Sequence, residues 1–279
     1  MTTAAALDGT CDVMGLHRTA LAVREHVLAI AAGPIGTHVG GSLSVTDILV
    51  ALYREVLRVR PAEPDWPERD RFVLSKGHAS AALYATLAEC GFFPVEELAT
   101  YGRAGGRLMA HPTRAVPGVE FATGSLGHGL SLATGLALVA QREERAHRVF
   151  VVMGDGELQE GSVWEAAMAA AHYGLNNLTA VVDRNRLQIN GSTEDRMSLG
   201  PLADKWRAFG WQVSEVDGHD FTTLVPALRT PAAGGPKLLI ADTVKGRGVR
   251  HLEHRKQGHF ARLGPQAYER ALGALREAA

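Results

Sequence analysis

Three short segments of the chain are almost wholly apolar, and helical patterns lie between and before them. The segments 149–153, 178–182 and 238–241 lack the polar alternation of a half-exposed strand, which is typical of parallel strands covered on both faces. Residues 71–74 and 212–216 are shorter candidate strands. Helices are expected near residues 15–32, 44–57, 78–90, 125–146, 162–173, 200–209 and 220–228.

This alternation predicts an α/β fold with a mostly parallel, doubly wound sheet and helices on both faces. We expect one domain over residues 1–279. In such folds, ligands bind outside the carboxyl ends of the strands. The residues that follow each predicted strand are therefore the first candidates for chemistry.

One helix carries a detailed local prediction. Ser162-Val-Trp-Glu165 has the form of a capping box at the helix start. The spacing of Trp164, Ala167, Met168 and Ala171 predicts one buried stripe, and Gly174 is placed for a left-handed C-terminal cap.

Composition narrows the class of protein. The chain is 46% hydrophobic and 21% charged, with a formal net charge of −1, so no excess charge favours nucleic acid or an anionic membrane surface. No segment reaches the roughly 18 apolar residues of a membrane span. The N-terminus does not have the pattern of a signal peptide. Two cysteines, Cys11 and Cys90, are too few for a disulfide framework and favour a cytosolic location.

The sharpest chemical signal lies at two successive strand ends. Gly154-Asp155-Gly156 follows strand 149–153, and Asn185 follows the next strand. Parallel strands would bring Asp155 and Asn185 to the same sheet edge, where their oxygens suit Mg²⁺ or Ca²⁺ and phosphate would complete the shell. The Gly156 amide could approach such a phosphate closely.

Three other interpretations of these residues compete with a metal site. A dinucleotide fingerprint needs a third glycine that GDGELQEG lacks. An EF-hand starting at Asp183 would place Leu187 and Ile189 where oxygen ligands and the turn glycine are required. A plain surface turn explains the glycines but not the spacing to Asn185.

The whole segment resembles the thiamine-diphosphate motif of the transketolase family, which reads here GDGELQEGSVWEAAMAAAHYGLNNLTAVVDRNRLQINGSTED. The resemblance extends, in the family's order, through THVGGSLS, LSKGHASAALYA, TGSLGHGLS and DTVKGRG. It implies that thiamine diphosphate is bound through Mg²⁺ or Ca²⁺. The metal ligands would be Asp155, Asn185 and the Leu187 carbonyl.

The resemblance also assigns residues around the cofactor. The cofactor-binding positions it implies are Gly124 and Leu126, whose backbone lines the aminopyrimidine ring, together with His78, Gly154, Asp155, Gly156, Glu160, Asn185 and Lys245. Glu160 matches a carboxylate near the subunit interface, for which a solvated charge at a helix start is the structural alternative.

Four of the twelve histidines stand in unusual surroundings, in the segments GTHVGG, SKGH, LMAHPTR and KQGHF, and histidine suits proton transfer near neutral pH. The resemblance implies that His38, His111 and His259 face the reacting sugar and that His78 lies at the cofactor. His251 and His254 are alternatives to His259, because Phe260 stands where the family has glycine and the segment is unusually basic. His128 replaces a common glutamine, and His147, His172 and His219 are interpreted as structural.

The matching motifs belong to the diphosphate-binding half of the family. The resemblance therefore implies the N-terminal subunit of a split transketolase, whose separate C-terminal partner carries the pyrimidine domain, with two copies of each chain. The reaction would transfer a two-carbon ketol unit from a ketose phosphate to an aldose phosphate. Alternatives are a deoxyxylulose-phosphate-synthase-like enzyme, a ketolase of specialised metabolism, and a non-catalytic cofactor-binding assembly subunit.

Overall fold

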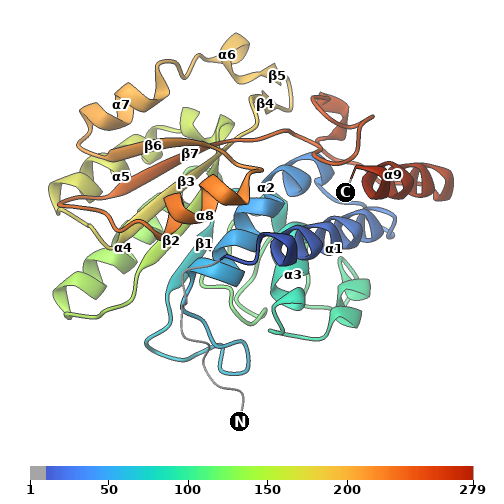
Figure 1. Ribbon diagram of the computed structural model, residues 1–279, viewed down its shortest axis with the longest axis horizontal. Helices are drawn as coiled ribbons and strands as arrows, with labels where there is room; N and C mark the ends of the chain where they lie inside the picture. The colour runs from blue at the N-terminus through green and yellow to red at the C-terminus, as the bar shows by residue number, and fades with distance from the viewer. Residues whose placement is uncertain (1–10, 279) are drawn as a thin grey trace.

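A five-stranded parallel sheet forms the centre of the protein (Figure 1). The computed structural model describes residues 11–278. The strand order is β1-β2-β3-β7-β6. The strands are β1 (Arg71–Leu74), β2 (Val149–Gly154), β3 (Leu178–Arg184), β6 (Gln212–Asp217) and β7 (Lys237–Asp242). The predicted strands and the doubly wound α/β class are confirmed.

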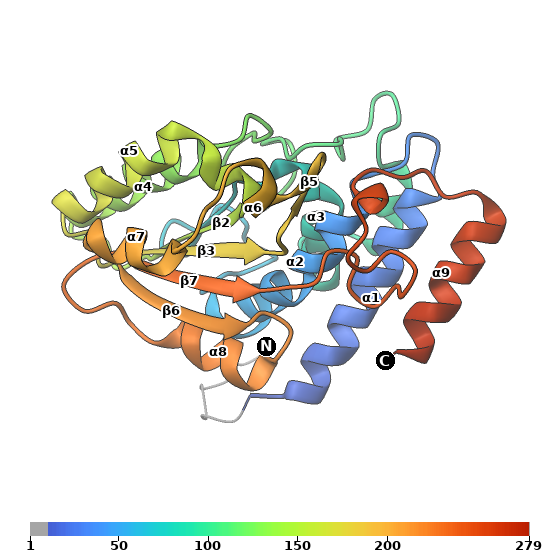
Figure 2. The same ribbon diagram turned by 90° about the horizontal axis from the view of Figure 1, so that it is seen from above.

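Helices cover both faces of the sheet, as the wholly buried central strands require (Figure 2). Alternate strand residues belong to two separate cores: Phe150 and Val152 to one, Val149 and Val151 to the other. The first core is covered by α1 (Val13–Ala31), α2 (Val39–Ala51), α3 (Ser80–Glu89) and α8 (Phe221–Arg229). The second is covered by α4 (Gly129–Arg142), α5 (Gly161–His172) and α7 (Leu202–Ala208).

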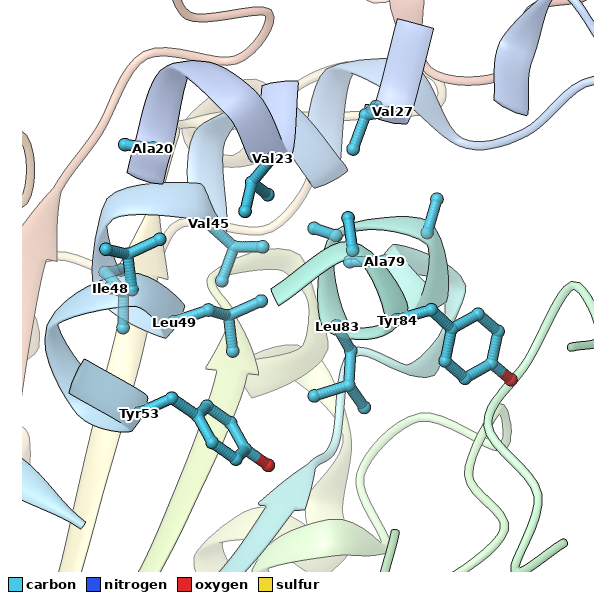
Figure 3. Close-up of a cluster of buried hydrophobic side chains, with 14 of the residues drawn as sticks. Ala20, Val23, Val27, Val45, Ile48, Leu49, Tyr53, Ala79, Leu83 and Tyr84 are labelled. Carbon is cyan, nitrogen blue, oxygen red and sulfur yellow. The ribbon is translucent and has the colours of Figure 1, made fainter. Parts of the chain in front are cut away.

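Helices α1, α2 and α3 pack directly against one another in the first core (Figure 3). Helix α2 is the most deeply buried of the three. Every one of its residues is buried, including the apolar Val45, Ile48 and Leu49, so the helix is enclosed on all sides. Each such side chain contributes about 1.5–3 kcal/mol by its burial. The N-terminus of this fixed helix begins next to His38.

Several boundaries differ from the prediction. Helix α2 begins at Val39 rather than 44 and continues into a π-helical turn, Leu52–Val56. Helix α4 begins at Gly129, because residues before it form an irregular glycine-rich loop. Helix α9 (Pro265–Glu277), which packs on α1, was not predicted. It fully buries only Ala271 and Leu275, but Tyr268 and Leu272 lie on the same face at helical spacing.

The smaller elements follow the third strand. A short hairpin joins β4 (Leu187–Gln188) and β5 (Gly191–Ser192) and leads into α6 (Thr193–Arg196).

The predicted capping box of α5 is wrong. The N-cap residue is Glu160, without a side-chain cap, and the Ser162 hydroxyl instead donates to the Gly127 carbonyl at 3.0 Å. The predicted stripe is also displaced, because Met168 is 54% exposed and the fully buried face is Val163, Ala166, Ala167 and Ala170. Gly174 does adopt the predicted left-handed conformation, with φ of 61°.

Within residues 11–278, no helix is both long and apolar enough to cross a membrane. Cys11 and Cys90 are both free thiols. The cytosolic location stays a prediction.

Candidate active site

The carboxyl ends of β2 and β3 bring Asp155 and Asn185 to one edge of the sheet. Gly154 pairs with Asp183 in the parallel register, so the residues that follow them emerge side by side. The Asp155 carboxylate accepts hydrogen bonds from the Gly156 amide at 2.8 Å and from the Arg186 amide. Asp155 is 3% exposed and Asn185 is 8% exposed. The juxtaposition expected from the sequence is therefore present in the structure.

Burial acts strongly on the Asp155 carboxyl. Desolvation, followed by the negative charge of Asp183, raises the pKa of Asp155 from its ordinary 3.8 to about 6, although the two amide hydrogen bonds oppose this rise. A nearby cation would relieve the unfavourable charge. The carboxylate is thus arranged to bind a positive ion.

A buried ion pair lies beneath this edge. Lys76, which is 1% exposed, binds Asp183 through its ammonium group and also donates to the Gly41 carbonyl at 3.0 Å. Asp183 accepts further hydrogen bonds from Ser44 at 2.7 Å and from Thr243. The pair joins α2, the turn after β1 and the end of β3, and it fixes their relative positions.

Lys245 connects the strand edge to the histidines. Its ammonium donates to the Leu187 carbonyl at 2.9 Å and lies 3.1 Å from Nδ1 of His259. Burial, followed by the positive charge of Lys76, lowers the pKa of Lys245 from 10.5 to about 8. Lys245 therefore remains mainly cationic at neutral pH and can bind an anion.

Four histidines gather beside this edge. The ring centroid of His38 lies 5.3 Å from that of His78, 6.1 Å from that of His111 and 5.3 Å from that of His259. The exposed Phe260 ring packs edge-on against His38 at 5.1 Å. These residues come from four separate segments of the chain.

Three imidazoles of this cluster, those of His38, His78 and His259, are neutral at physiological pH. Burial, followed by the neighbouring His111 and Lys245, lowers the pKa of His38 to about 4. Burial and Lys245 lower the pKa of His259 to about 4, and burial lowers the pKa of His78 well below its ordinary value. A neutral imidazole can both donate and accept a hydrogen bond, as contact with sugar hydroxyls requires.

The two alternatives to His259 lie elsewhere. His251 and His254 are exposed, and neither is among the rings that pack on His38. The structure thus brings His259, rather than these neighbours, into the cluster.

The glycine-rich loop before α4 closes one side of the site. Gly124 has φ of 151°, and a Cβ there would come within 2.9 Å of the His111 ring. Leu126 is half-buried. A Cβ on Gly127 would come within 2.6 Å of the Cβ of Glu160, so the exposed Glu160 lies against this loop.

Another buried acidic side chain, that of Glu157, holds the loop in place. The Glu157 carboxylate accepts from the Gly127 amide at 2.9 Å, from the Gly154 amide at 3.1 Å and from the Ser75 hydroxyl. Glu157 is 2% exposed, and its pKa is raised by burial. It fastens the loop to the end of β2.

Sequence reasoning missed Lys76, Asp183 and Glu157. Each stands next to a predicted site residue or motif, in SKGH, VVDRN and GDGE. The sequence signal that could have identified them is a charged residue at or just after the end of an apolar strand. Their partners, however, lie far away in sequence, so the pairing itself could not be read from spacing.

The residues at the strand edge suit a divalent ion and an anionic cofactor. One carboxylate, one amide and one carbonyl are hard oxygen donors of the kind Mg²⁺ and Ca²⁺ take. The Leu187 carbonyl retains a second lone pair besides the one that Lys245 uses. Among residues 11–278, no cluster of three or more histidine, cysteine or acidic side chains could hold a metal, so a site here would need phosphate or water ligands.

Two orphaned polar atoms also fit a bound ligand. The Nδ1 of His38 and the hydroxyl of Thr123 are buried and have no hydrogen-bond partner among the described residues. Thr123 lies against Gly77, next to His78. Buried polar groups are normally paired, so partners are expected from a ligand at this place.

Comparison with known proteins identifies the family. Residues 18–274 match the family described as transketolase, thiamine diphosphate binding domain. The chain is 43% identical over 256 residues to one of the subunits of the apulose-4-phosphate transketolase of Phocaeicola vulgatus, covering 91% of each chain. It is also 43% identical over 247 residues to the 6-deoxy-6-sulfo-D-fructose transketolase subunit SqwG of a Clostridium species, covering 87% of this chain and 90% of that one.

Solved structures agree with this. The transketolase of Campylobacter jejuni superposes with a TM-score of 0.86 at 29% identity, over 96% of this chain and 43% of that one. The transketolase from Leishmania mexicana gives a TM-score of 0.84 at 28% identity, over 94% and 44%. This chain thus spans less than half the length of these two transketolases. It belongs to the transketolase family of transferases, whose thiamine diphosphate binding domain it carries.

Proposed function

We propose that this chain is the cofactor-binding subunit of a two-chain transketolase that transfers a two-carbon ketol unit from a ketose phosphate to an aldose phosphate. The observation that best supports this proposal is the position of Lys245. Its ammonium contacts both the Leu187 carbonyl at the strand edge and His259 of the histidine cluster. The strand edge, where an ion and a diphosphate could bind, therefore lies next to the histidines that could transfer protons. This arrangement suits a cofactor fixed at one end and reacting at the other.

At the anchoring end, Asp155, Asn185 and the Leu187 carbonyl would hold Mg²⁺, or Ca²⁺, and Gly154, Gly156 and Lys245 would face the diphosphate. The raised pKa of Asp155 and the hard donors support a divalent ion there. Leu126, Gly124 and His78 would line the rest of the cofactor, with Glu160 beside the same loop.

Thiamine diphosphate, when bound, supplies an electron sink for breaking the carbon–carbon bond beside a carbonyl. The chain's part is to orient the sugar and handle protons. His38, His111 and His259 would hydrogen-bond the sugar hydroxyls. His38 and His259 would do so as neutral imidazoles, since burial lowers the pKa of each to about 4. His38 and His259 can then accept a proton and return it.

A second, partner chain carrying the pyrimidine domain is part of the proposal, with two copies of each chain. Both relatives are named as subunits, which supports a second chain, and symmetric assemblies are the usual outcome for soluble oligomers. The substrates named for those relatives, apulose-4-phosphate and 6-deoxy-6-sulfo-D-fructose, favour a specialised sugar over the pentose phosphates of central metabolism.

Reconstitution tests the function. The purified chain is mixed with its partner chain, thiamine diphosphate and Mg²⁺, and ketol transfer is followed with a panel of ketose and aldose phosphates. We expect turnover only when both chains are present, and His38→Ala to slow it without changing cofactor affinity. Substantial transfer by this chain alone, or none by the pair across the panel, would refute the proposal.

A further inference from the structure

His219 lies in the turn after β6, away from the histidine cluster, yet both of its ring nitrogens have defined partners. Its side chain is 6% exposed. The Val244 amide donates to Nε2 at 2.8 Å, and Nδ1 lies 2.6 Å from a carboxylate oxygen of Asp47. Because Nε2 accepts a hydrogen bond, the proton of the neutral ring is on Nδ1, which donates to Asp47.

A buried carboxylate, that of Asp47, holds the ring at Nδ1. Asp47 lies on α2 and is 3% exposed. Arg24 of α1 binds both of its oxygens, at 3.0 and 2.6 Å. Such a two-pronged pair fixes the carboxylate, and the carboxylate in turn fixes the orientation of the imidazole.

On the other side of the ring, the chain continues directly from Val244 to Lys245. The backbone here is fixed by the Gly246 amide, which donates to the Gly40 carbonyl at 3.1 Å, and by the Lys245 carbonyl, which accepts from the His254 amide at 3.0 Å. These two hydrogen bonds join main-chain atoms, whereas the hydrogen bond from the Val244 amide is accepted by a side chain, that of His219 in the turn between β6 and α8. This hydrogen bond holds the main chain at the residue directly before Lys245.

We propose that His219 is a positioning residue for Lys245. Its ring accepts a hydrogen bond from the Val244 amide and so holds the main chain where the Lys245 ammonium reaches the Leu187 carbonyl and His259. It touches neither cofactor nor substrate itself. This inference rests on the proposed function for its effect on the cofactor, but the position of Lys245 can be measured without it. The sequence alone favours a structural role for His219, and the proposal gives that role a specific target.

Two substitutions separate the two ring nitrogens. In His219→Gln the amide oxygen reaches the place of Nε2 and can still accept from Val244. In His219→Asn the shorter side chain can keep the contact with Asp47 but leaves the Val244 amide unpaired. His147→Ala is the matched control, because His147 is also a partly buried histidine but lies just before β2, at the end of the strand opposite Asp155.

The first readout is the rate of Lys245 acetylation by acetic anhydride, quantified by mass spectrometry on the cofactor-free chain. Lys245 is 2% exposed and thus protected in the parent protein. We expect His219→Asn to raise the rate about ten-fold, as expected for loss of one buried hydrogen bond, and His219→Gln and His147→Ala to change it little.

The second readout is the dissociation constant of thiamine diphosphate with Mg²⁺, titrated calorimetrically into the complex with the partner chain. His219→Asn should weaken binding about ten-fold while His219→Gln stays near the parent value. Equal labelling of Lys245 in the Asn and Gln variants, or a lower melting temperature with unchanged labelling and affinity, overturns the inference. If the parent complex binds no thiamine diphosphate, the proposed function fails, while the labelling still decides the role of His219.

Discussion

Breaking the buried pair between Lys76 and Asp183 should cost more than breaking any surface ion pair of this protein. Asp183 is fully buried and accepts from Lys76, Ser44 and Thr243. Burial opposes its ionisation, yet the Lys76 ammonium and these donors hold its pKa below the ordinary value. In Asp183→Asn the Lys76 ammonium, 1% exposed, would keep the Gly41 carbonyl as a hydrogen-bond partner but lose its counter-charge.

Removing one member of such a pair costs about 3–5 kcal/mol, because an uncompensated charge stays buried. For a chain of this size, about 2–4 °C of melting temperature is lost per kcal/mol, so we expect a fall on the order of 10 °C. The matched control is Asp204→Asn, whose pair with Arg207 is 2.9 Å long but has side chains 51% and 69% exposed. It should cost about 1 kcal/mol or less.

The assay is urea unfolding at pH 7 followed by circular dichroism, in the absence of cofactor. The double variant Lys76→Met with Asp183→Leu removes both charges and should recover part of the loss, since no uncompensated charge stays buried, although the Ser44 and Thr243 hydroxyls lose their acceptor. If Asp183→Asn and Asp204→Asn unfold at the same urea concentration, the reasoning about the buried pair is refuted.

Two further predictions concern the site. The pKa of His38 is lowered to about 4, so as the pH falls below about 6.5 the unfolded chain binds a proton at this residue before the folded chain does. The free energy of unfolding should therefore decrease between pH 6.5 and 4, by about 1 kcal/mol at pH 5 once solvent screening of this half-buried ring is allowed for. In urea unfolding, His38→Gln should remove this part of the pH dependence, and an unchanged slope would contradict the assignment. Gly124→Ala adds a Cβ 2.9 Å from the His111 ring on a backbone with φ of 151°, so it should lower kcat of the reconstituted enzyme about ten-fold or more, and full activity would show that this close approach is unimportant.

Much of the fold could be predicted because its central strands are buried on both faces. Runs such as 149–153 are too short for a typical buried helix and rich in valine, so a buried strand is the best explanation, and the helices between the strands then indicate a parallel sheet. Helix α9 follows the last strand, so the alternation of strands and helices did not point to it, although Tyr268, Ala271, Leu272 and Leu275 recur at helical spacing. The capping box at Ser162 failed because tertiary contact with Gly127 took the hydroxyl that the local pattern assigned to the helix.

The site residues also fall into those that local sequence predicts and those that depend on long-range contacts. Asp155 and Asn185 were predictable because each directly follows a strand, and the two strands are parallel neighbours that end at the same edge of the sheet. Lys76 and Asp183 are 107 positions apart, and His219 reaches Asp47 across 172 positions. No local spacing encodes such pairs. They become visible only when the packed helices and the sheet bring the segments together.

The central claim is that Asp155 and Asn185 anchor thiamine diphosphate through a divalent cation. The most direct test is calorimetric titration of thiamine diphosphate into the complex of this chain with its partner chain, with Mg²⁺ or with a chelator, for the parent chain and for Asp155→Ala. We expect tight binding by the parent that requires Mg²⁺, and weak binding by Asp155→Ala that is the same with and without the metal. Equal affinity in the parent and the variant, or parent binding that is indifferent to Mg²⁺, would contradict the account.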